Sequence, residues 1–289
     1  MEISNKVQIP SSKSTLERPP IFILGVPRSG TTLLRMMIDS HPEIMCGPEA
    51  HWITTQQLDW APSLRSLTRF LTRNEWGAVK AFKGVEQDLI YQLMANFIDE
   101  IMSASARSHG KIQWAEKTPR NIIALPFLYQ LFPHAKFVYI YRDGRDVALS
   151  TVGKWKTIPI SDKKVKNNYK NALKRWVDWN QKFGKDAKKV SLNYISVCYE
   201  DLVTSPQEEI GKLLEFLEVP WSDKVLEPHA VEHDIITMKG AGMQTFFNRN
   251  SIDTASLYRW KKELNWLQKR TTKSIAEETL LKFGYEPTM

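Results

Sequence analysis

The chain has 289 residues, of which 42% are hydrophobic and 25% are charged, so we expect most of it to fold around a sizeable core. Its longest apolar runs, residues 21–26 and 137–141, are far shorter than the ~20 residues of a membrane-spanning helix, which excludes a spanning protein. Lysine and arginine outnumber aspartate and glutamate by 40 to 32, and the resulting charge of +8 favours a polyanionic partner such as a nucleotide, a nucleic acid or a membrane surface.

The N-terminal segment and the cysteines give no sign of an export signal or of a metal site. Residues 1–19 mix charged side chains with serine and proline and contain no apolar stretch of the kind that directs export. We therefore predict a flexible N-terminal tail over these residues and a cytoplasmic location. Cys46 and Cys198 belong to no metal-ligand spacing, so we expect reduced thiols and no metal site.

A strand, a loop and a helix open the folded part of the chain. Residues 21–26 form a continuous apolar run between two prolines, which is typical of a central strand in a parallel sheet. A helix is predicted from Gly30 to Ser40, because apolar residues follow at helical spacing and His41 precedes a proline.

The same order returns further along the chain. A helical stretch at residues 121–132 leads to a second buried strand at 136–141, which ends in a polar turn at 142–146. A third strand is predicted at 191–199, and the segment SPQE at 205–208 predicts a capping box with proline in the first helical turn.

This alternation predicts a single α/β domain with a P-loop-like, mostly parallel sheet that is flanked by helices on both faces. No internal repeat or flexible linker suggests a domain boundary. We assign the domain to residues 20–289, with helical cap elements near residues 53–110, 155–185 and 221–289. Ligands of such folds bind at the carboxyl ends of the strands.

The loop after the first strand has the glycine spacing of a phosphate-binding loop. The segment GVPRSGTT at residues 25–32 lies between a buried strand and a helix, where backbone N–H groups and the helix start can bind one phosphate. Thr31 occupies the position of the lysine that nucleoside triphosphatases place after the second glycine, which argues against hydrolysis of ATP or GTP. The candidate phosphate-binding residues are Arg28, Ser29, Gly30, Thr31 and Thr32.

A second phosphate site is predicted at the end of the strand at residues 136–141. Arg142 follows this strand directly, and Ser150 lies on the helix that begins near Gly144. An arginine and a hydroxyl suit a second phosphate, so the two strand ends together suggest a nucleotide with phosphates on its 5′ and 3′ sides.

These motifs, in this order, resemble the sulfotransferase family that uses 3′-phosphoadenosine-5′-phosphosulfate (PAPS), and within it the branch of the protein-tyrosine sulfotransferases and related bacterial enzymes. The resemblance runs from about residue 20 to about residue 230. Beside the two phosphate motifs it rests on three segments, which are DSHPE through CGPE at residues 39–49, EKTP at 116–119 and CYEDL at 198–202.

The resemblance implies roles for single residues around the transferred group. Arg28 and Lys117 would bind the bridging and sulfuryl oxygens and stabilise the charge on the leaving group. Glu49 would accept the proton of the acceptor, and His51 is the alternative base because it lies two residues on and histidine titrates near neutral pH.

The resemblance also implies how the nucleotide is bound. Arg142 and Ser150 would bind the 3′-phosphate, Tyr199 would approach the adenine, and Arg249 is a further candidate contact. The implied donor is PAPS, the product is adenosine 3′,5′-bisphosphate (PAP), and no metal is required. The chain departs from the tyrosine enzymes at His51, where they place an arginine near the acceptor.

Because of His51 and the absent export signal, we expect a bacterial-type enzyme of natural product biosynthesis. Its acceptor would be a small or medium-sized molecule with a hydroxyl, amine or guanidine group, and not a protein. We expect neither a nucleic acid nor a membrane as a partner. Homo-oligomerisation is left open.

Two other classes of function fit parts of the sequence. In a P-loop kinase, Arg28 would replace the usual lysine and Asp143 would hold Mg²⁺. In a nucleic-acid-binding protein, the lysines of residues 154–174 and the aromatic side chains between them would form the interface. We favour a solvated helix for most of that run, because Tyr169, Leu173 and Trp176 share one apolar face.

Overall fold

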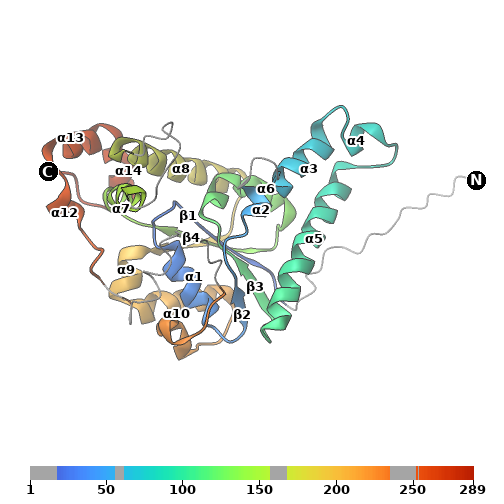
Figure 1. Ribbon diagram of the computed structural model, residues 1–289, viewed down its shortest axis with the longest axis horizontal. Coiled ribbons are helices and arrows are strands. Elements are labelled where there is room, and N and C mark those ends of the chain that lie inside the picture. The colour runs from blue at the N-terminus through green and yellow to red at the C-terminus, as the bar shows by residue number, and fades with distance from the viewer. Residues whose placement is uncertain (1–17, 56–61, 157–167, 235–251, 253) are drawn as a thin grey trace, which may run out of the picture.

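The computed structural model describes residues 18–55, 62–156, 168–234, 252 and 254–289. At its centre lies a five-stranded sheet in the order β2-β3-β1-β4-β5, and every neighbouring pair of strands is parallel (Figure 1). The prediction of a single α/β domain with a parallel sheet is confirmed. The strands are β1 (Ile21–Gly25), β2 (Ile44–Cys46), β3 (Gln113–Glu116), β4 (Lys136–Tyr141) and β5 (Tyr194–Cys198).

The continuous apolar runs are explained by burial of the sheet on both faces. In β1, Ile21 and Ile23 pack into one hydrophobic cluster, whereas Phe22 and Leu24 pack into another. Successive side chains of a strand point to opposite faces. A strand that is covered on both sides therefore needs apolar residues at every position.

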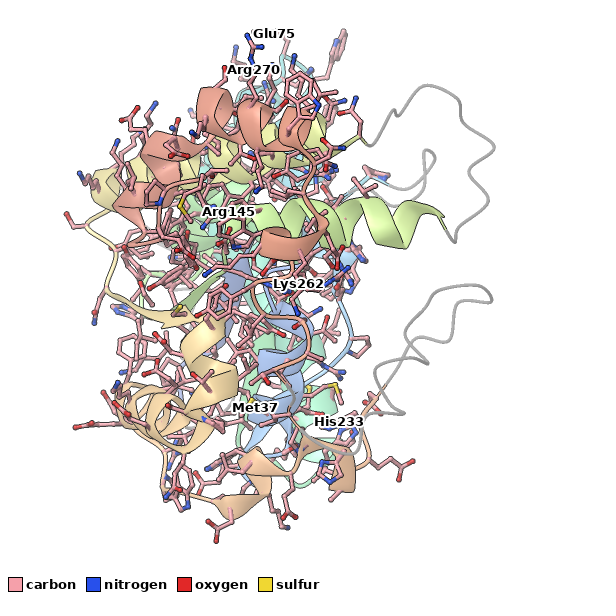
Figure 2. All side chains as sticks on the ribbon, turned by 90° about the vertical axis from the view of Figure 1, so that its left-hand side faces the viewer. Met37, Glu75, Arg145, His233, Lys262 and Arg270 are labelled. Carbon is pink, nitrogen blue, oxygen red and sulfur yellow. The ribbon has the colours of Figure 1, made fainter. Side chains whose placement is uncertain are left out.

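Helices cover both faces, as predicted. One cluster joins the sheet to α1 (Thr31–Asp39), α9 (Tyr199–Thr204) and α10 (Pro206–Leu217). The other joins it to α5 (Gln87–Ser108), α6 (Leu125–Leu131), α7 (Gly144–Lys156), α8 (Tyr169–Lys189), α12 (Trp260–Glu263) and α14 (Glu277–Lys282), with α13 (Trp266–Ile275) against α8. In the side view, Met37 lies in the α1 layer and Arg145 in the α7 layer (Figure 2).

Short helices complete the chain. The helices α3 (Leu64–Arg73) and α4 (Ala78–Ala81) form an arm with α5 that extends away from the sheet (Figure 1). Single turns are formed by α2 (His51–Thr54), η2 (Asp223–Leu226) and η3 (Pro228–Ala230), and η1 covers Pro119–Ala124. Within the described ranges, no helix combines the length and the apolar character that a membrane crossing requires.

Two predicted boundaries were wrong, and two strands were missed. The helix expected at residues 121–132 is divided into η1 and α6, because Pro126 lacks a backbone N–H and starts a new helix. The strand expected at 191–199 begins only at Tyr194, since Ser191 has a φ of 48° and belongs to a turn. The strands β2 and β3 were missed, because three and four residues carry too little pattern.

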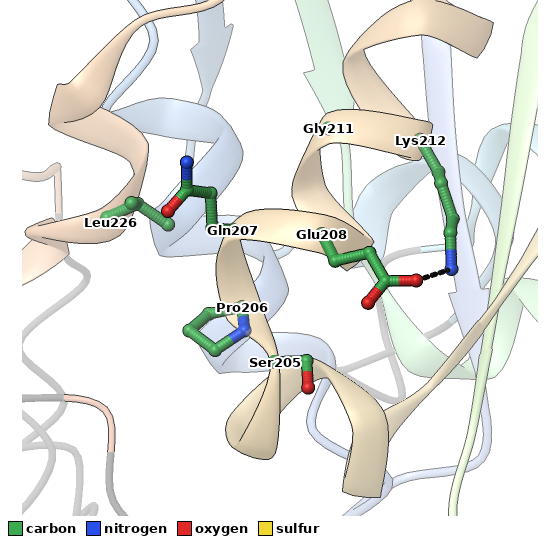
Figure 3. A pocket seen from close by; sticks show the side chains of 7 residues that line it. All are labelled: Ser205, Pro206, Gln207, Glu208, Gly211, Lys212 and Leu226. Atoms are coloured by element: carbon green, nitrogen blue, oxygen red, sulfur yellow. Dashed lines mark ion pairs between the residues drawn. The ribbon is translucent and has the colours of Figure 1, made fainter.

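The capping box at Ser205 was also wrong. Pro206 does begin α10, but the Ser205 side chain caps no backbone N–H, and the Glu208 carboxylate lies 2.8 Å from Lys212 Nζ instead (Figure 3). Ser205 also ends α9, because its N–H donates to the Asp201 carbonyl. Ser205 has φ −135° and ψ 55°, which differs from the extended conformation of a usual N-cap.

Candidate nucleotide and transfer site

The predicted site residues meet at one edge of the sheet. Because all strands are parallel, their carboxyl ends lie at the same edge. The phosphate loop follows β1, which lies between β3 and β4. Lys117 follows β3 and Arg142 follows β4, so these cations lie on the two sides of the loop. Glu49 follows β2, and Tyr199 follows β5.

The phosphate loop contains two residues with positive φ, a backbone conformation that few residue types adopt readily. Arg28 has a φ of 77° and Gly30 a φ of 94°. A Cβ atom at Gly30 would lie 2.2 Å from Cδ2 of Tyr199, so the loop can approach the β5 end only with glycine. The helix α1 begins at Thr31, followed by Thr32, and no side chain of a described residue caps it. Its first N–H groups therefore remain available for an anion.

The residues of the two predicted phosphate sites lie together in one cluster. Arg28 Nε donates to Ser150 Oγ at 3.0 Å, and Arg142 Nη1 lies 3.4 Å from the Arg28 carbonyl oxygen. Partial burial and the nearby Arg142 cation lower the pKa of Arg28 from its ordinary value. The Arg28 guanidinium stays charged at neutral pH despite this lowering. An anion bound between this group and Arg142 would relieve their repulsion.

Arg142 is held by residues from two other parts of the chain. Its guanidinium lies 4.3 Å from the centre of the Tyr199 ring, and Nη2 donates to the Ser256 carbonyl at 2.5 Å. The Tyr199 hydroxyl lies 2.7 Å from Ser256 Oγ. Ser256 was not predicted from the sequence, because it lies more than 100 residues after Arg142 and has no motif around it.

Two buried polar atoms fit a nucleotide phosphate. Arg142 Nε and Ser29 Oγ are both buried, and neither has a hydrogen-bond partner among the described residues. Unpartnered buried donors are rare, because each costs roughly 1–3 kcal/mol. A phosphate would supply acceptors for both, so the residues of this cluster fit a phosphorylated nucleotide.

A second cluster joins Glu49, Lys117 and His51. The Lys117 ammonium lies 2.6 Å from Glu49 Oε1, and His51 Nε2 lies 3.0 Å from Oε2. Burial opposes the charge on Glu49, but the contacts with His51 and Lys117 outweigh it and lower the pKa of Glu49 to about 2. The carboxylate is therefore ionised at neutral pH, with one oxygen held by each partner.

The carboxylate that the kinase alternative requires is already paired. Both oxygens of Asp143 accept hydrogen bonds from the Arg145 guanidinium at 2.7–3.1 Å, and both residues are buried. The Arg145 guanidinium also lies 3.5 Å from the centre of the Trp260 ring. Asp143 thus orients Arg145 in the interior and does not point a free carboxylate at the phosphate loop.

Some predicted contacts fall outside the described residues. Arg249 is among them, as are the lysines at positions 163–166. On α8, Tyr169, Leu173 and Trp176 are buried, and Lys170 and Lys174 are exposed. The described part of the basic run is therefore the solvent side of an amphipathic helix.

Comparison with known proteins identifies similar chains. The model of the family described as "Sulfotransferase family" matches residues 19–223. Protein-tyrosine sulfotransferase A of Caenorhabditis elegans is 34% identical over 72% of this chain, which spans only about half (52%) of that enzyme. Human protein-tyrosine sulfotransferase 1 is 31% identical over 94% of this chain and 70% of its own length. The solved sulfotransferase domain from the curacin biosynthetic pathway has the same fold, with a TM-score of 0.66, 23% identity and coverage of 93% of this chain and 98% of that domain.

Proposed function

Because the chain belongs to the sulfotransferase family, we propose that it transfers a sulfuryl group from PAPS to the hydroxyl of a protein tyrosine. The observation that carries the proposal is the convergence at one sheet edge of the Glu49–Lys117 pair with the cluster of Arg28, Ser150 and Arg142. The first group suits transfer to a hydroxyl, and the second suits a phosphorylated nucleotide.

The acceptor in this proposal replaces the one expected from the sequence. The curated relatives reported above are animal enzymes named protein-tyrosine sulfotransferases. They support a tyrosine hydroxyl and give no support to a natural product or to a bacterial type. Among the described residues, no group of three or more His, Cys, Asp or Glu side chains is arranged to hold a metal ion.

The proposed reaction assigns one task to each residue. The acceptor oxygen forms a bond to sulfur while the bond from sulfur to the bridging oxygen breaks, and PAP departs with that electron pair. The tyrosine proton passes to Glu49. Arg28 and Lys117 stabilise the negative charge that develops on the departing oxygen. The donor contributes the sulfuryl group, and the protein contributes position, charge and the base.

The Lys117–Glu49 contact limits the basicity of Glu49. A carboxylate with a pKa of about 2 is a weak base, and a donor oxygen that binds the Lys117 ammonium competes with Glu49 for the same positive charge. We infer that a negatively charged donor draws Lys117 away and so raises the pKa of Glu49 toward its ordinary value. The base would thus become effective only after the donor is bound.

A calorimetric titration without Mg²⁺ tests the nucleotide assignment. We expect PAP to bind roughly 10- to 100-fold more tightly than ADP, because the 3′-phosphate gains charged hydrogen bonds with Arg142. Arg142→Ala should abolish this preference. Arg73→Ala, which removes an equal charge from the solvent side of α3, should retain it. Equal binding of both nucleotides, or ADP binding only with Mg²⁺, would contradict the proposal.

A further inference from the structure

The strand β3 ends in a buried carboxyl group that the proposed chemistry does not use. Glu116 is 1% exposed and directly precedes Lys117. Its Oε1 accepts hydrogen bonds from the Ala50 N–H at 3.2 Å and from the Thr118 hydroxyl, and its Oε2 accepts from the Asn121 amide. A buried carboxyl group is retained at low cost only when such donors satisfy it.

The same contacts hold both ends of α2. Ala50 is the N-cap residue of this helix and has no side chain that could cap it. The Glu116 carboxylate accepts the N–H of this N-cap residue, as the second acceptor of a capping box does, and puts a negative charge near the positive end of the helix. At the other end, the hydroxyl of Thr54 donates to Asn121 Oδ1. A helix of one turn is unstable by itself, so its position depends on these contacts.

We propose that Glu116 is the positioning residue that fixes Glu49 against Lys117, a role that rests on the function proposed above. The hydrogen bond from Ala50 to Glu116 joins the residue after Glu49 to the residue before Lys117. The strand β3 pairs with both β1 and β2 and is therefore held in the sheet. The part that can move is the segment with Glu49, which this bond fastens to the sheet.

The charge state of Glu116 sets the conditions of a test. Burial raises the pKa of Glu116 to about 7, against the opposing influence of Thr118, Ala50 and Lys117. The carboxylate form accepts all the donors around it, whereas a protonated carboxyl group must donate from one oxygen. Variants should therefore be compared at about pH 8, where the carboxylate predominates.

The first test compares two substitutions at this position. Glu116→Ala should lower kcat for sulfuryl transfer by ~10²-fold through misplacement of Glu49, with the KM for the donor within about threefold of the wild type. Glu116→Gln keeps an acceptor for Ala50 and Thr118, so its kcat should lie within about tenfold of the wild-type value. Equal losses in both variants would contradict a role in positioning.

A matched control is a second buried carboxyl group that contacts β3. Asp99 on α5 is also buried and accepts from Trp114 Nε1 of β3 at 2.8 Å. Asp99→Asn should lower the free energy of unfolding without a comparable loss of kcat. If Glu116→Ala does not fold, Asn121→Ala removes the contacts with Thr54 and with Glu116 Oε2, leaves the bonds of Glu116 with Ala50 and Thr118, and should lower kcat by roughly tenfold. An unchanged kcat in Asn121→Ala would then overturn the inference.

A double-mutant cycle shows whether Glu116 acts through Glu49. In a Glu49→Gln background, Glu116→Ala should cause almost no further loss of kcat, because the group it positions is already gone. Losses that multiply would overturn the inference while the proposed function stands. A normal kcat in Glu49→Gln alone would instead remove Glu49 as the base, and the inference would fail with that assignment.

Discussion

Replacement of Lys117 by methionine is expected to lower kcat for sulfuryl transfer by ~10²–10³-fold. The side chain is 4% exposed and its ammonium lies 2.6 Å from Glu49, so it is a fixed cation at the end of β3. Methionine keeps the length of the side chain and removes the charge. The leaving group would then lack one of the two cations that stabilise it. A single-turnover assay with labelled donor measures this effect directly.

The pKa of Glu49 provides a second measurement on the Lys117→Met variant. Burial favours the neutral form of Glu49, and its low pKa of about 2 depends on His51 and Lys117. Without Lys117, the pKa should rise toward the ordinary value of 4.5. Because the native pKa is depressed, the pair stabilises the fold above about pH 4.5, and this stability is lost as the pH falls toward 2. The Lys117→Met variant should lose less stability over that range.

A control on another lysine separates charge from position. Lys136 lies at the amino end of β4, on the opposite edge of the sheet, and pairs with Glu218. Lys136→Met should leave kcat unchanged. A Lys117→Met variant with wild-type kcat and normal donor binding would contradict the role assigned to Lys117.

Replacement of Glu49 by glutamine is expected to lower kcat by ~10²–10⁴-fold, because glutamine cannot accept the tyrosine proton. His51→Asn should lower kcat much less, since His51 contacts Glu49 but is not the base in this account. The measurement is kcat and kcat/KM for both variants between about pH 5 and pH 9. The outcome that reverses the assignment is a larger loss in His51→Asn than in Glu49→Gln.

The pH dependence distinguishes the two candidate bases further. In the free protein the Glu49 carboxylate is ionised at all pH values well above 2. If Glu49 is the base, its own ionisation should impose no acidic limb on kcat/KM between pH 5 and pH 8. A limb that disappears in His51→Asn would instead assign the base to His51.

The apolar strands β1 and β4 were predictable, as was β5 apart from its start, whereas β2 and β3 were not. Residues 21–25 and 136–141 are buried on both faces, and this burial imposes an unbroken apolar pattern. The strands β2 and β3 contain three and four residues, and β3 includes Gln113 and Glu116. These polar side chains are buried only because distant groups accept or donate their hydrogen bonds, which the local sequence does not reveal.

The site residues also differ in how far the sequence could predict them. Motifs of neighbouring residues, such as the loop at residues 25–32, were recognisable because one short segment carries the whole pattern. The contact of Arg28 with Ser150 and that of Arg142 with Ser256 each join residues more than 100 positions apart. The fold alone brings these pairs together. Glu116 lay inside a recognised segment, but its role depends on Ala50 and Asn121, whose backbone and amide groups form no motif.

The most direct test of the proposed function is transfer of labelled sulfuryl from PAPS to a tyrosine-containing peptide in the presence of EDTA. We expect label on the tyrosine oxygen, release of one PAP for each peptide modified, and loss of both products in Glu49→Gln and Lys117→Met. A protein that binds PAP through Arg142 but labels no hydroxyl, or that modifies the peptide only with Mg²⁺ and a nucleoside triphosphate, would contradict it.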